Sequence, residues 1–144
     1  MGTDIHVHVY RKDKYDNYEE LKLYRNVGGE MKLCYLPFED RDYELFDKLT
    51  DIVELRGVWP HLDTEDMNDT YNHTWFDWCE LNALADTPRA MVKEWMENEN
   101  GDEVEVKEYN ILAPWVAKIG YLLDCYNVYF PVPGEITVCV SFDN

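Results

Sequence analysis

Strict alternation of apolar and polar residues at both ends of the chain limits the possible folds more than any other feature. Near the start, Ile5, Val7 and Val9 alternate with polar residues, and near the end Ile136, Val138, Val140 and Phe142 do the same. A period of two is typical of a half-buried β-strand. Because the two segments have matching apolar faces, we expect them to be neighbouring strands of one sheet.

The remaining patterns predict further strands and several helices. Residues 20–25 and 30–36 alternate around Gly28-Gly29, which favours a hairpin because glycine tolerates a positive φ. Helical spacing predicts helices over 40–57, 75–85, 87–98 and 114–124. Asp40 and Thr74 are the expected N-caps of the first two helices. Residues 58–72 are expected to form a long loop, and residues 103–109 a short strand or an exposed extension. The pattern predicts a single α+β domain over 1–144, with a mixed or mainly antiparallel sheet and helices packed on one face.

Charge decides which partners are compatible with the chain. Thirty acidic residues against 13 basic ones give a formal net charge of −17, while 46% hydrophobic residues indicate a globular protein. A field of this sign repels nucleic-acid phosphate and anionic lipid, so we expect no direct nucleic-acid or membrane binding. Two interpretations remain, a solvated acidic surface or a mimic that occupies the nucleic-acid-binding face of another protein.

The four cysteines are far apart and form no C-x-x-C pair, which argues against a zinc ribbon or a redox motif. No secretory signal or long apolar run is found in the sequence. We therefore expect reduced thiols and a cytoplasmic location.

Asp4, His6 and His8 are the first candidate site, because side chains at i, i+2 and i+4 of a strand point to the same side. Two imidazoles and a carboxylate could hold a divalent metal, which would be the only cofactor. They could equally act as acid and base on a phosphate ester without metal. The plain alternative is a solvent-facing strand surface with two histidines.

His73 is the second candidate, since it precedes a predicted helix whose free backbone N–H groups can hold an anion. Trp75 and Trp78 could stack on a flat, nucleotide-like ligand, although a surface or capping histidine is the simpler interpretation. Arg41 and Arg56 are candidate anion-binding groups, and ordinary surface ion pairs are the alternative for both.

Four segments together resemble a family of small uncharacterised phage and prophage proteins. They are the start MGTDIHVHV, the segment RDYELFDKLTDIVELRG, the HTW triplet and the ending ITVCVSFDN. Members begin MG-x-DIH, carry R-x-Y-x-LF and H-[ST]-W, and end in FDN; many have an aromatic residue where His8 stands. The resemblance implies a viral origin and a location in the host bacterial cytoplasm. It points to these site residues: Asp4, His6, Arg41, Tyr43, His73, Trp75 and Asp143.

Three functions are compatible with these observations. The first is binding of a small phosphorylated ligand, such as a nucleotide immune signal, which is then sequestered or cleaved. Cleavage would use His6 and His73 as acid and base, with an arginine beside the phosphate. The second is an acidic inhibitor that binds a basic host protein, and the third is a metal-dependent hydrolase built on Asp4, His6 and His8. Whether the protein is an enzyme is left open.

Overall fold

The computed structural model describes residues 4–34, 56–61 and 70–143. The helix expected over 40–57 therefore lies outside the described residues, and so do Arg41 and Tyr43. Its expected end, Gly57, is described and has a φ of +78°. That left-handed conformation suits the residue that ends a helix.

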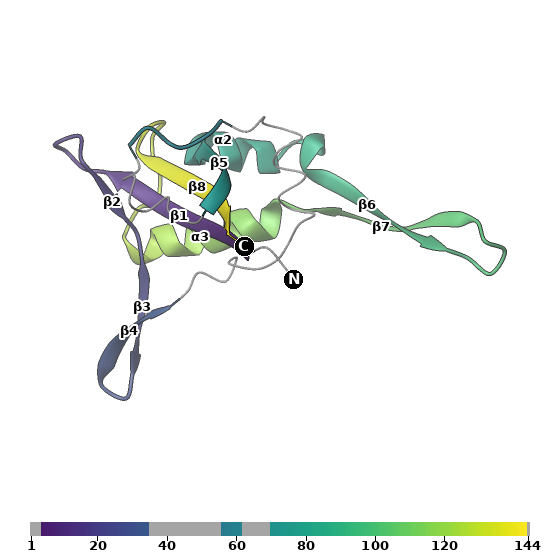
Figure 1. Ribbon diagram of the computed structural model, residues 1–144, viewed down its shortest axis with the longest axis horizontal. Helices are drawn as coiled ribbons and strands as arrows, with labels where there is room; N and C mark the ends of the chain where they lie inside the picture. Colours follow the sequence, from purple (N-terminus) through teal and green to yellow (C-terminus); the bar gives the residue numbers. More distant parts are fainter. Residues whose placement is uncertain (1–3, 35–55, 62–69, 144) are drawn as a thin grey trace.

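A four-stranded antiparallel sheet forms the centre of the molecule, in the order β2-β1-β8-β5 (Figure 1). Its strands are β1 (Asp4–Lys12), β2 (Tyr18–Glu20), β5 (Thr70–Asp77) and β8 (Ile136–Asp143). The first and last strands pair directly, with Val7 opposite Val140 and Val9 opposite Val138. The expectation that the two alternating ends of the chain are neighbours is confirmed.

Two helices, α2 (Trp78–Ala85) and α3 (Ala113–Cys125), cover one face of this sheet. Leu81 of α2 and Ile119 of α3 are fully buried together with Phe76 and the apolar residues of β1 and β8. The helix expected over 114–124 is confirmed, and Pro114 lies in its first turn, where a missing N–H costs nothing. The chain is thus α+β, with antiparallel sheets and helices packed on one side.

Two hairpins extend from this body (Figure 1). One consists of β3 (Leu23–Val27) and β4 (Glu30–Cys34), joined at Gly28 and Gly29, which both have positive φ. This is the hairpin that the alternation predicts. The other consists of β6 (Met91–Glu97) and β7 (Glu103–Asn110) and reaches furthest from the sheet.

The helix predicted over 87–98 is wrong. Pro88–Ala90 form a single 3-10 turn, and the chain then continues as β6. Met, Lys and Glu are good helix formers, so local propensity favoured a helix here. Cross-strand pairing with β7 overrides that weak preference, and Asn100-Gly101 lie in the hairpin connection instead of ending a helix.

The helix predicted over 75–85 begins later than expected. Residues 70–77 form β5, and α2 starts at Trp78 with Asp77 as its N-cap. Thr74, the expected cap, is buried within the strand. Pairing of β5 with β8 holds residues 74–77 extended, because Thr74 and Phe76 lie opposite the core residues Val140 and Val138.

From the burial of the central strand pair we predict that two valine-to-alanine substitutions differ strongly in their effect on the free energy of unfolding. Val138 is 0% exposed on β8, whereas Val132 is 62% exposed in the preceding loop. We expect Val138→Ala to lower the free energy of unfolding by about 1.5–3 kcal/mol, since it removes buried methyl groups and leaves a cavity. Val132→Ala should change it by less than about 0.5 kcal/mol. Urea denaturation measures both, and equal effects would contradict the assigned core.

Candidate functional site

Three strands that are distant in sequence bring predicted site residues to one end of the sheet. β8 lies between β1 and β5, and the register pairs Asp143 with Asp4 on one side and with Thr70 on the other. Two residues further along, Ser141 of β8 lies opposite His6 of β1. The first and last strands of the sheet therefore meet here, as their matching apolar faces predicted.

A β-bulge brings His73 to the other side of the same β8 residue. The register between β5 and β8 shifts between Tyr71 and Thr74, opposite the stretch of β8 that contains Ser141. Bulges redirect side chains and are frequent next to functional sites. His6 and His73 thus lie on the two strands that flank Ser141, and both are half-buried.

The face that carries these residues is polar although it is buried. Thr137, Cys139 and Ser141 alternate with the core valines of β8 and so lie on the face opposite the helices. Each is less than a tenth exposed. Buried polar groups need hydrogen-bond partners and give less stability than apolar ones. The middle strand therefore places two hydroxyls and a thiol on the side of the sheet away from α2 and α3.

On this face His8 is bonded to Glu20 of β2. The His8 ring donates from Nδ1 to a Glu20 carboxylate oxygen, and Lys22 Nζ lies 3.3 Å from the other oxygen. Burial opposes ionisation of Glu20, but the bonds from His8 and Lys22 outweigh it, so its pKa is lowered. His8 is therefore engaged with β2.

Aromatic rings pack around Trp59 on the β1–β2 side. The Trp59 ring centroid lies 5.1 Å from Tyr10, 4.7 Å from Tyr18 and 5.1 Å from His61. Trp59 is buried, although the sequence placed it in a polar loop. This cluster fixes one border of the polar face.

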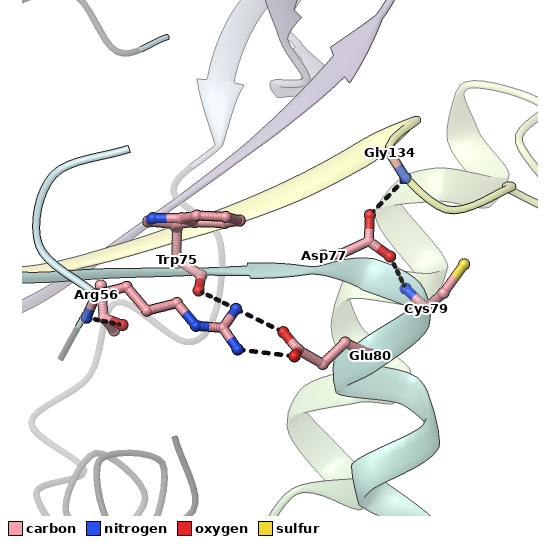
Figure 2. A network of polar contacts seen from close by, with 7 residues as sticks. Arg56, Trp75, Asp77, Cys79, Glu80 and Gly134 are labelled. Atoms are coloured by element: carbon pink, nitrogen blue, oxygen red, sulfur yellow. Dashed lines mark hydrogen bonds and ion pairs between the residues drawn. The ribbon is translucent and has the colours of Figure 1, made fainter. Parts of the chain in front are cut away.

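Arg56 connects β5 to α2 (Figure 2). Its guanidinium donates two hydrogen bonds of 2.7 Å to the Glu80 carboxylate and one of 3.1 Å to the carbonyl of Trp75. The bonds to Glu80 raise the pKa of Arg56. The guanidinium also lies 5.2 Å from the Trp75 ring centroid. In this arrangement Arg56 holds the strand and the helix together and orients Trp75.

Asp77 connects the same helix to the loop before β8. One carboxylate oxygen accepts from the amide of Cys79, and the other accepts at 2.7 Å from the amide of Gly134 (Figure 2). Gly134 has a φ of +86°, which favours glycine at this position. Together, Arg56 and Asp77 fix β5 and β8 at the helix terminus.

The predicted metal site on Asp4, His6 and His8 includes Asp4, whose side chain lies outside the described residues. Within residues whose side chains are described, no three His, Cys, Asp or Glu residues form a group that could hold a metal ion. The side chains of Asp4 and Asp143 are outside this set, so a metal site on Asp4, His6 and His8 stays a prediction.

Of the predicted site residues, Asp4, His6, His73 and Asp143 share one end of the sheet, whereas Arg56 and Trp75 lie nearer α2. Sequence reasoning missed Glu20 as the partner of His8, and it missed Ser141. A signal for Ser141 was present in the alternation of β8, where it falls on the polar side.

Comparison with known protein families, curated proteins and solved structures gives no match for this chain. No helix among the described residues is long and apolar enough to cross a membrane.

The Glu20 environment predicts a pH-dependent contribution to stability. Because the folded-state pKa is lowered from its ordinary value of 4.5, ionised Glu20 stabilises the fold above that pH, and this contribution is lost as pH falls through the folded-state pKa. We expect Glu20→Gln to cost about 1 kcal/mol at pH 6 and less at pH 3. Exposed Glu19, which pairs with Arg11, provides the control, since Glu19→Gln should cost less at both pH values. An equal cost of Glu20→Gln at pH 3 and pH 6, measured by urea denaturation, would contradict this account.

Cys139 is predicted to be unreactive in the folded protein. Burial, with a smaller effect of the Glu20 charge, raises the pKa of its thiol to about 12, and only the thiolate is a nucleophile. At pH 8 iodoacetamide should modify exposed Cys125 and leave Cys139 unmodified until the protein is unfolded. Peptide mass spectrometry distinguishes the two sites, and rapid labelling of Cys139 in the native state would refute the prediction.

Proposed function

We propose that the protein binds a small phosphorylated ligand at the end of the sheet where β1, β8 and β5 adjoin. The observation that supports this is the placement of His6 and His73 on the two strands flanking Ser141. Neighbouring strands lie about 4.8 Å apart, so these two strands are roughly 10 Å apart. A phosphate group between them could contact both half-buried imidazoles.

Two histidines on opposite sides of one phosphate suit acid–base chemistry as well as binding. One neutral imidazole can accept a proton from an attacking hydroxyl, while the other, protonated, donates to the leaving oxygen. Without a suitably placed hydroxyl the same pair only donates hydrogen bonds to phosphate oxygens, and the ligand is sequestered. His6 and His73 are therefore proposed as the catalytic pair if cleavage occurs.

The acidic positions next to them favour a ligand with hydroxyl or amino groups beside its phosphate. Asp4 and Asp143 occupy directly opposite register positions. A ligand with hydroxyl or amino groups suits two acidic positions, and a nucleotide supplies both as ribose hydroxyls and exocyclic amines. Trp75, next to Cys139 on the same sheet, offers a stacking surface for a base.

A counter-defence role follows only from the resemblance to phage proteins. A nucleotide immune signal would be a ligand of the proposed chemistry, and removing it would benefit a phage. The third interpretation, a metal-dependent hydrolase, uses the same end of the sheet. The test below separates it through its metal requirement.

The test is incubation of the purified protein with cyclic di- and trinucleotides and ADP-ribose derivatives, with and without divalent metal. Chromatography before and after heat denaturation follows each compound. New products indicate cleavage, and a compound that disappears and returns intact on heating indicates sequestration. We expect His6→Ala and His73→Ala each to slow cleavage about 100-fold or more, or to weaken binding about tenfold.

His61→Ala is the matched control, because His61 belongs to the aromatic cluster around Trp59 and lies apart from Ser141. It should leave cleavage or binding unchanged. Equal losses in His61→Ala and His6→Ala would contradict the assigned site. If every compound remains free and unchanged, the ligand proposal fails for this panel.

An acidic inhibitor directed at a basic host protein is the second candidate function. A specific observation favours it, since the β6–β7 hairpin is acidic, exposed and separate from the sheet site.

A further inference from the structure

The β6–β7 hairpin is an arm that projects from the body (Figure 1). Every residue from Lys93 to Glu108 is exposed, while Ala90 and Leu112, which border the arm, are fully buried. Seven residues of extended strand span roughly 23 Å. The outer part of the arm therefore contributes nothing to the core.

Side-chain hydrogen bonds close the tip of the arm and tie its base to the body. At its tip Asn98 accepts hydrogen bonds from the amides of Asn100 and Asp102. At its base the Asn110 side chain donates to the carbonyl of Ala85 on α2, and its oxygen accepts from the amide of Leu112. A two-stranded ribbon is marginally stable alone. The bonds at the base hold the arm to the body, and its exposed faces can contact a partner.

One face of the arm combines an exposed tryptophan with acidic residues. Trp95 lies opposite Glu105, and Glu97 lies opposite Glu103. Because alternate residues of β6 share a face, Trp95 and Glu97 are on the same side, together with their partners. Trp95 is 53% exposed, so about half of its surface is available to another molecule.

Glu97 and Glu103 form a like-charged pair at directly opposite positions, an arrangement that weakens a ribbon. The two lysines of the arm do not relieve it, since Lys93 lies 3.7 Å from Glu105 and Lys107 lies 3.8 Å from Glu94. A guanidinium or ammonium group from outside would satisfy both carboxylates and stack on Trp95.

Net charge identifies the kind of partner. Residues 91–110 contain seven acidic residues and two lysines, a formal charge of −5, whereas residues 23–34 of the other hairpin have a formal charge of +1. Such an arm repels nucleic acid and the same arm of a second copy. It attracts a basic protein segment.

We propose that this face of the β6–β7 arm docks a lysine- or arginine-rich protein segment. A basic side chain of the segment lies over the Trp95 ring, between the Glu97 and Glu103 carboxylates. Tryptophan is common among residues that dominate binding energy at interfaces, so Trp95 is the anchor. This inference is independent of the ligand proposed at the sheet end.

The experiment selects binders to the full chain from a displayed library of random peptides and measures their affinities by fluorescence anisotropy. We expect enriched peptides to be basic, with affinity that falls as salt concentration rises. Trp95→Ala should weaken binding about tenfold or more. The double substitution Glu97→Gln and Glu103→Gln should weaken it and reduce its salt dependence.

Met96→Ala is the matched control, because Met96 is 58% exposed on the same strand but lies on the opposite face. It should leave the affinity unchanged. Far-ultraviolet circular dichroism checks that each variant is folded, and Trp95→Phe should retain part of the binding. No enrichment, enrichment of acidic peptides, or equal losses in Met96→Ala and Trp95→Ala would each overturn the proposal. Trp95-dependent dimers in sedimentation experiments would assign the face to a second copy and overturn it as well.

Discussion

Antiparallel pairing of the first and last strands is the interaction on which the rest of the structure depends. β1 and β8 are in register from Asp4 with Asp143 to Arg11 with Ile136. The pair provides an edge for β2 on one side and for β5 on the other, and it presents the valines against which both helices pack. Contacts between chain ends close the longest possible loop, so this pairing is costly in entropy and must be stabilised by burial.

The same alternation that forms the core also creates the polar face. Each strand residue that faces the helices is followed by one that faces away, so Val140 of the core is adjacent to Ser141 beside the histidines. A shift of one residue in register would exchange the two sets and lose the core. The positions of His6 and Ser141 relative to each other are therefore as strongly determined as the core itself.

Elements with strong sequence periodicity were predicted correctly. An element whose conformation depends on pairing with another strand was not. β1, β8, α3 and the Gly28-Gly29 hairpin follow from alternation, helical spacing or turn residues. The segment that forms β6 contains Met, Lys and Glu, and only its partner β7 makes it extended. For the site, the alternation of β1 selected His6, but neither the strand order nor the bulge before Thr74 has a local signal. The sequence could therefore suggest that His6 and His73 act together, whereas their placement on either side of Ser141 follows only from the paired strands.

The net charge of −17 opposes ligand binding at the sheet and favours partner binding at the arm, the two proposed surfaces. It opposes an anionic ligand at the sheet, so binding there depends on short-range donors such as His6 and His73 in a half-buried setting, where bonds are less screened. At the β6–β7 arm the same negative charge is sufficient to attract a cationic segment. The arm is longer than a Debye length of about 8 Å, so the potential at its tip is set mainly by its own carboxylates. The proposed phosphate site on the sheet and the acidic surface of the arm are therefore compatible, because solvent ions separate the two fields.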